Sequence, residues 1–112
     1  MAYPSLRDDG NSVVLDLHGA TVDEAVHLAK KLIGAAAARG RASVKIIHGS
    51  STTGTYGGRP TIKSELHALI DANRLHSSIA STWFSEDYMV LSLPLGQKSI
   101  PTPLTLLDLQ RL

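Results

Sequence analysis

Two short apolar stretches, separated by an amphipathic one, constrain the fold of this chain more than any other feature. The apolar stretches run from Ser12 to Leu17 and from Ala42 to Ile47, and each is bounded by turn residues, which is typical of a buried strand. Between them, apolar residues recur at helical spacing from Val22 to Ala36, with Thr21 placed as N-cap and Gly40 as the stop. Strands joined through a helix are usually parallel neighbours with a right-handed crossover, so the sequence predicts a β-α-β unit.

The second half of the chain predicts one more helix and two more strands. A polar, glycine-rich stretch over 50–60 predicts a loop, and the apolar stripe after Pro60 predicts a helix that fades near Asn73. Strands are expected over Ile79 to Phe84 and Tyr88 to Leu93, joined as a hairpin through Ser85-Glu86-Asp87. The predicted order is β-α-β-α-β-β. This order indicates an α/β two-layer sandwich, with two helices on a mixed four-stranded sheet.

A chain of 112 residues is long enough for a single core and too short for a second domain. We expect an N-terminal arm over residues 1–12, the folded domain over 13–95 and an apolar tail over 96–112. The tail ends in L-T-L-L-D-L-Q-R-L, which is too apolar to be left in water. The tail is therefore predicted to pack on its own domain or to join copies of the chain in a homo-oligomer or larger complex.

Composition excludes several classes of protein. Hydrophobic residues make up 43% of the chain and the formal net charge is +1, so any binding to a polyanion must use a local basic patch. There is no cysteine, which excludes disulfides and thiolate zinc sites. The N-terminus has no apolar stretch of signal-peptide length, and no stretch approaches the roughly 20 apolar residues of a membrane span, so we expect a cytoplasmic protein without membrane contact.

Both predicted strands of the β-α-β unit end in a His-Gly corner. Asp16 and His18 lie on the same face of the first strand, because side chains alternate along a strand, and His48-Gly49 follows the second strand. Neighbouring parallel strands end at the same edge of a sheet, where open α/β sheets bind their ligands. One histidine at a strand end is more often structural than catalytic, but two His-Gly corners at one edge favour a functional site.

These residues resemble the small MutS-related family, usually called Smr. Its signature L-D-L-H-G is present unchanged at Leu15 to Gly19, and a second strand ends at His48-Gly49 with a glycine-rich continuation. The resemblance extends over about Val13 to Leu95. It implies a fold similar to the C-terminal domain of the third bacterial translation initiation factor. It also implies binding of DNA or RNA, with nicking of DNA or cleavage of RNA.

The resemblance implies catalytic roles for Asp16, His18 and His48. One imidazole accepts a proton from the attacking hydroxyl or water, the other assists the leaving oxygen, and Asp16 orients an imidazole and raises its basicity. The loop after Gly49 departs from the family pattern, because it is longer and has Ser51 in place of a glycine. Lys63 is expected to stand in for the basic residue of the family. The predicted substrate-binding residues are Gly19, Gly49, Ser50, Ser51, Tyr56, Arg59 and Lys63.

The altered loop leaves an alternative open, namely a non-catalytic module that binds nucleic acid or a protein. No cofactor is required by the sequence. Asp16, His18 and His48 suit a divalent metal, but two imidazoles at adjacent strand ends equally suit proton transfer. The remaining histidines, His27, His67 and His76, lie on helices or just beyond them and show no partner pattern.

Overall fold

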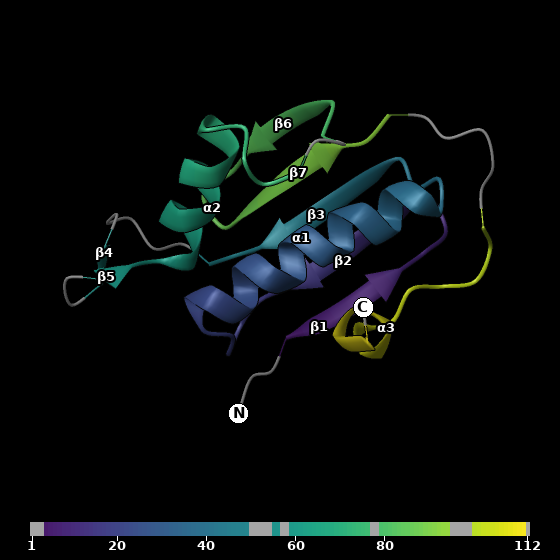
Figure 1. The fold of residues 1–112 in the computed structure, drawn as a ribbon, viewed down its shortest axis with the longest axis horizontal. Coiled ribbons are helices and arrows are strands. Elements are labelled where there is room, and N and C mark those ends of the chain that lie inside the picture. The colour runs from purple at the N-terminus through teal and green to yellow at the C-terminus, as the bar shows by residue number, and fades with distance from the viewer. Residues whose placement is uncertain (1–3, 50–54, 57–58, 77–78, 95–99, 112) are drawn as a thin grey trace.

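The computed structural model describes residues 4–49, 55–56, 59–76, 79–94 and 100–111. In these residues a five-stranded sheet carries three helices (Figure 1). The sheet consists of β1 (Ser5–Asp8), β2 (Ser12–Asp16), β3 (Ser43–Ile47), β6 (Ser81–Phe84) and β7 (Tyr88–Ser92), in the order β1-β2-β3-β7-β6. The helices are α1 (Val22–Ala38), α2 (Ile62–Asp71) and α3 (Leu106–Arg111), and β4 (Thr55–Tyr56) pairs with β5 (Arg59–Pro60) in a separate small sheet.

The predicted β-α-β unit and hairpin are confirmed. Strands β2 and β3 pair in parallel on either side of α1 in the sequence, and β6 pairs antiparallel with β7. Strand β7 also pairs antiparallel with β3, so the sheet is mixed, as expected. Thr21 caps α1 as predicted, since its side-chain oxygen accepts a hydrogen bond from the backbone N–H of Glu24.

The prediction of four strands is wrong, because β1 adds a fifth. Strand β1 pairs antiparallel with the outer side of β2, where the sequence suggested only an arm. Its residues alternate, and Leu6 and Asp8 share the face that packs on the helices. An aspartate at an inward position hides the alternation of apolar and polar residues by which a half-buried strand is recognised.

The prediction of two helices is also wrong. The tail forms the short helix α3, which packs on α1 and buries Leu109. The stretch expected as a loop contains the β4–β5 pair, and α2 starts after Pro60, with Thr61 as its N-cap in a capping box with Ser64. In the described part of the chain, no helix is long and apolar enough to cross a membrane.

All three helices lie on one face of the sheet. In the three central strands, β2, β3 and β7, the residues that point toward the helices are buried, and Val13, Leu15, Val44, Ile46, Met89 and Leu91 form the sheet side of the core. Figure 1 shows α1 lying across β2 and β3, with α2 near its first turns and α3 beside β1. The alternate residues of the same strands point away from the helices and are only partly buried. In the described ranges of the chain, the opposite face of the sheet carries no helix.

A buried ion pair joins the two ends of the described chain. Arg41 donates to both carboxylate oxygens of Asp8, over 2.8 and 3.0 Å, and neither side chain is exposed to solvent. The same carboxylate accepts the backbone N–H of Leu104 over 2.6 Å, and Arg41 donates to the carbonyl oxygen of Thr102. Burial opposes ionisation of Asp8, but the hydrogen bonds from Arg41 and from the Leu104 and Gly10 amides outweigh it and keep the pKa below its usual value. The tail is thus held against β1.

Candidate active site

The two His-Gly corners lie at one edge of the sheet, because they follow adjacent parallel strands. Asp16 is in register with Ile47, and the backbone N–H of Leu17 donates to the carbonyl oxygen of Ile47 over 3.0 Å. Each corner turns through a glycine with positive φ, +86° at Gly19 and +90° at Gly49, a conformation that other residues rarely adopt. The chain therefore leaves the sheet directly after each histidine.

Asp16 holds His18 at the first corner. One carboxylate oxygen, Oδ1, accepts the backbone N–H of His18 over 2.9 Å and also contacts the ring nitrogen Nδ1 of the same residue. The His18 side chain is 57% exposed, whereas that of Asp16 is 33% exposed. A carboxylate on Nδ1 fixes the orientation of the ring and leaves Nε2 as the nitrogen directed at a ligand. The pair thus has the arrangement of an oriented, accessible proton-transfer group.

The second corner is fixed by the turn between β6 and β7. The backbone N–H groups of His48 and Gly49 both donate to the carbonyl oxygen of Asp87, each over 2.9 Å. The Nδ1 atom of His48 lies 2.7 Å from the carbonyl oxygen of Gly49, which can only accept, so this nitrogen carries the proton. The other ring nitrogen, Nε2, then has a free lone pair, yet it is buried and has no hydrogen-bond partner in the described residues.

The imidazole of His48 packs against that of His67 on α2, a residue to which the sequence assigned no role. The two rings meet edge to face with centroids 6.0 Å apart, and His67 also lies against Phe84, 4.2 Å between centroids. The Nε2 atom of His67 is likewise buried without a partner in the described part of the chain. Two buried ring nitrogens that the described residues leave without a partner are uncommon, because each unsatisfied buried polar atom costs about 1–3 kcal/mol.

Burial lowers the pKa of both His48 and His67, and the positive charge of Lys63 lowers both further. Lys63 lies one helical turn before His67, so both side chains are on the same side of α2. Its ammonium donates to the carbonyl oxygen of Glu86 over 3.0 Å, in the same turn that holds His48. Lys63 therefore lies beside the second corner, where the sequence predicted a basic residue. Because Lys63 and His67 are four residues apart on a helix, the sequence could have indicated that His67 lies beside the second corner.

The three predicted catalytic residues lie in two separate groups at the edge of the sheet. Asp16 contacts His18 and, like Val14, points away from the helices, whereas His48 contacts His67 on the helix side. In the described residues no hydrogen bond or ring contact joins His18 to His48. A substrate that uses both histidines must therefore span the edge of the sheet between them.

The glycine-rich loop is described in part. Ser50 and Ser51 lie outside the described residues, and Tyr56 pairs with Arg59 through the backbone of the β4–β5 hairpin. The roles predicted for these four side chains remain predictions. In the described residues no group of three His, Asp or Glu side chains is arranged to hold a metal ion.

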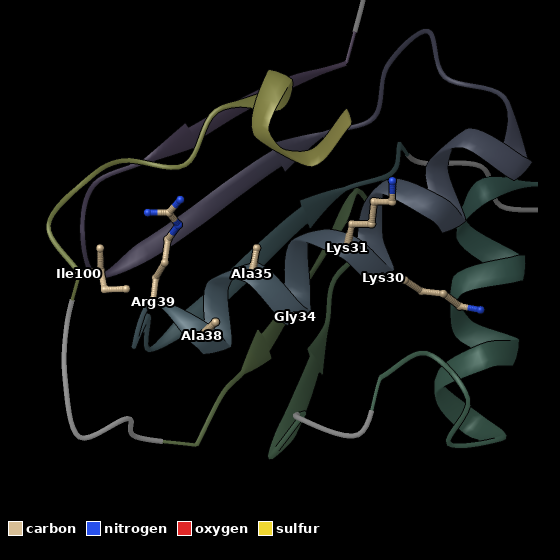
Figure 2. Close-up of a pocket in the computed structure, with 7 residues that line it drawn as sticks. All are labelled: Lys30, Lys31, Gly34, Ala35, Ala38, Arg39 and Ile100. Atoms are coloured by element: carbon tan, nitrogen blue, oxygen red, sulfur yellow. The ribbon is translucent and has the colours of Figure 1, made fainter. Parts of the chain in front are cut away.

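A cavity of about 500 Å³ lies away from this edge, between α1 and the tail. Figure 2 shows its lining: the cationic residues Lys30, Lys31 and Arg39 around Gly34, Ala35, Ala38 and Ile100. These seven residues include no carboxylate, imidazole or hydroxyl that could transfer a proton. This cavity therefore lacks the carboxylate and imidazole groups that the edge of the sheet provides.

Comparison with known families identifies the chain. The family model for the Smr domain matches residues 15–87, from Leu15 in β2 to the β6–β7 turn. This span includes both His-Gly corners, Lys63 and His67. Comparison with the curated proteins and with the solved structures gave no significant match. The match covers more than half of the chain, and the chain therefore belongs to the Smr domain family, which is generally linked to nucleic-acid binding and nuclease activity.

Proposed function

We propose that this Smr domain binds DNA or RNA and cleaves a phosphodiester bond at the edge of the sheet. The observation that carries the proposal is the pairing of Asp16 with His18. One carboxylate oxygen fixes both the backbone and the ring of an exposed histidine, which leaves Nε2 free to meet a substrate. An oriented imidazole of this kind contributes about 10²- to 10⁴-fold to reactions that need proton transfer.

The lowered pKa of His48 indicates which histidine accepts a proton and which donates one. A neutral His48 with a free lone pair on Nε2 suits the acceptor role, and His18, whose exposed ring is oriented by Asp16, suits the donor role. In this scheme His48 takes the proton of the attacking hydroxyl or water, and the oxygen of that group bonds to phosphorus. The bond from phosphorus to the leaving oxygen breaks, and that oxygen receives the proton of His18. Substrate binding must bring the hydroxyl to the buried Nε2 of His48.

The most direct test is cleavage of supercoiled plasmid and of single-stranded RNA, with and without a chelator. We expect His18→Ala and Asp16→Asn to lose most of the activity while folding normally. The exposed His27 on α1 supplies the matched control, and His27→Ala is expected to retain full activity. Full activity of His18→Ala would refute the proposal. Full activity of His48→Ala in a protein that needs His18 would remove His48 from the mechanism and leave His18 to handle both protons.

Binding is expected to depend on Lys63 and Arg59. The net charge of +1 gives little general attraction, so neutralising two local cations is expected to weaken binding to all sequences alike. The Arg59→Gln/Lys63→Gln variant is expected to lower the slope of log affinity against log salt concentration by about one to two units. Lys30→Gln, on the exposed side of α1, is the control. An unchanged slope would locate the contacts with nucleic acid elsewhere.

A second candidate function is a non-catalytic module that binds nucleic acid or a protein. The observation in its favour is the burial of His48 Nε2, which keeps this atom away from solvent. Binding without cleavage of any plasmid or RNA, by a protein with intact Asp16 and His18, would establish this second function. Assembly through the tail and a cytoplasmic location remain predictions.

A further inference from the structure

The face of the sheet opposite the helices carries a row of side chains suited to a single nucleic-acid strand. One row crosses all five strands in register and consists of Arg7, Val14, Lys45, Val90 and Trp83. Trp83 is 58% exposed, more than any other large hydrophobic side chain described. An exposed tryptophan next to cationic side chains is typical of surfaces that bind nucleic acid by stacking.

The adjacent row leads from this tryptophan to the candidate active site. It consists of Tyr88, Ile47, Asp16 and Ser5, each in register with the next. The ring of Tyr88 lies 5.7 Å from that of Trp83, between centroids, and the ammonium of Lys45 lies 4.1 Å from the centroid of Tyr88. Aromatic and cationic groups are therefore gathered on β3, β7 and β6, one to three strands away from Asp16.

The third row consists of four serines, Ser12, Ser43, Ser92 and Ser81, one on each of β2, β3, β7 and β6. Serine hydroxyls are common donors to phosphate oxygens. With Arg7, Lys45 and Asp16 on the same face, this row makes the surface more polar than the core of a typical protein–protein interface, which is depleted in charged residues. The composition thus favours a polar, charged partner over a second copy of this chain.

A hollow lies on the same face, at the end away from Trp83. It encloses about 340 Å³ between β1 and β3, within the range of small-ligand clefts, and Arg7, Val14, Asp16 and Ile47 are among its lining residues. Arg7 supplies a second cation there, and the carboxylate of Asp16 is engaged by His18. The distance from β6 to β2 is about three strand spacings, or roughly 14 Å. Sheets that bind RNA stack about two or three bases over a comparable width.

We propose that a single-stranded nucleic acid lies across this face, with bases stacked on Trp83 and Tyr88 and phosphates near Lys45 and Arg7, and that this path delivers a phosphodiester to His18. The proposal rests on the nuclease function proposed above and specifies its substrate as single-stranded. Bases in a duplex are already stacked on one another, so a flat sheet with protruding rings selects unpaired bases.

The chain has one tryptophan, so Trp83 reports directly on this face. Titration with a dodecamer of deoxythymidine, and with the uridine dodecamer, is expected to quench the tryptophan fluorescence, whereas a duplex of equal length is expected to bind more weakly and quench less. By anisotropy of a labelled dodecamer, Trp83→Ala is expected to lose about 5- to 150-fold in affinity, the range set by stacking of one base. Trp83→Phe keeps a stacking surface and is expected to recover most of that loss.

The cations provide an independent readout. Lys45→Gln and Arg7→Gln are each expected to lower the salt slope for the dodecamer by about 0.7, and Lys30→Gln on the helix side is expected to leave it unchanged. If the wild type binds the dodecamer without quenching, and Lys45→Gln matches Lys30→Gln, this face is not the binding surface, although nucleic-acid binding stands. If a second copy covers the face, sedimentation will show a dimer that Trp83→Ala dissociates, which also overturns the proposal. If no nucleic acid binds at all, both this proposal and the proposed function are refuted.

Discussion

The imidazoles of His48 and His67 meet edge to face with 6.0 Å between their centroids, and neither Nε2 atom has a partner in the described residues. One ring comes from the end of β3 and the other from the middle of α2, so the contact joins the sheet edge to the helix layer. Both rings are held in the neutral form, because burial lowers the pKa of each. The pair therefore couples the protonation of the site to the stability of the fold.

Acidification is expected to destabilise the protein through these two histidines. Unfolded histidines have a pKa of about 6.5, so below that pH the unfolded chain binds protons that the folded imidazoles do not. The stability that comes from keeping these two imidazoles neutral is fully present above about pH 6.5 and is lost as the pH falls through the lowered folded pKa values. Urea unfolding between pH 7 and pH 5 measures the effect, and NMR titration of the ring resonances gives the two folded pKa values. A His48→Gln/His67→Gln variant that kept the same pH dependence over this range would contradict this origin.

Replacing His67 by leucine is expected to leave the free energy of unfolding unchanged or to raise it by about 1 kcal/mol. The reason is that leucine removes a buried nitrogen that has no partner among the described residues, and it keeps an apolar contact with Phe84. Equilibrium urea unfolding is the measurement, and His27→Leu, at an exposed position on α1, is the control. A loss of more than about 1 kcal/mol would show that the His67 ring makes a stabilising polar contact.

The buried Arg41–Asp8 pair is expected to dominate the stability of the tail. Arg41→Met leaves a buried carboxylate without its cation and is expected to cost about 3–5 kcal/mol. Arg74→Met, at an exposed position after α2, is expected to cost well under 1 kcal/mol. Thermal unfolding compares the two variants. Equal melting temperatures of the two variants would contradict this prediction, because they would show that removing Arg41 from the buried pair costs no more than removing an exposed arginine.

Two leucines of α3 give a matched test of how the tail packs. Leu109 is fully buried, whereas Leu107 is 53% exposed. Leu109→Ala is therefore expected to cost about 2–5 kcal/mol, and Leu107→Ala less than about 0.5 kcal/mol. Denaturant unfolding at two protein concentrations separates packing within one chain from packing between chains. A larger cost for Leu107→Ala would indicate that α3 joins two copies of the chain.

The sequence predicted the parts of the fold that depend on local patterns. The β-α-β unit and the β6–β7 hairpin each combine an apolar stretch with clear turn residues, and both are present. Strand β1 could not be predicted, because its inward Asp8 is satisfied by Arg41, 33 positions away in the sequence. A single sequence carries no signal for a hydrogen bond of that range.

The site shows the same division between local and distant contacts. Asp16 ends β2 and His18 lies two residues further on, in the turn that follows, so their contact is local in the sequence. The contact between His48 and His67 depends on how α2 docks on the end of β3, which no local pattern specifies. The sequence therefore predicted no role for His67, although its four-residue spacing from Lys63 places both side chains on one side of the helix.

The carboxylate of Asp8 depends on a hydrogen-bond donor that is made near the end of synthesis. Its bond to the Leu104 amide spans 96 residues, and ribosomes add about 5–20 residues per second. Roughly 5 to 20 s therefore pass between the synthesis of Asp8 and that of its last donor. Once Arg41 has been made, the Asp8–Arg41 pair lacks the cover of the tail until Leu104 follows, so a nascent chain that stalls before Leu104 carries the Asp8 carboxylate without one of its donors.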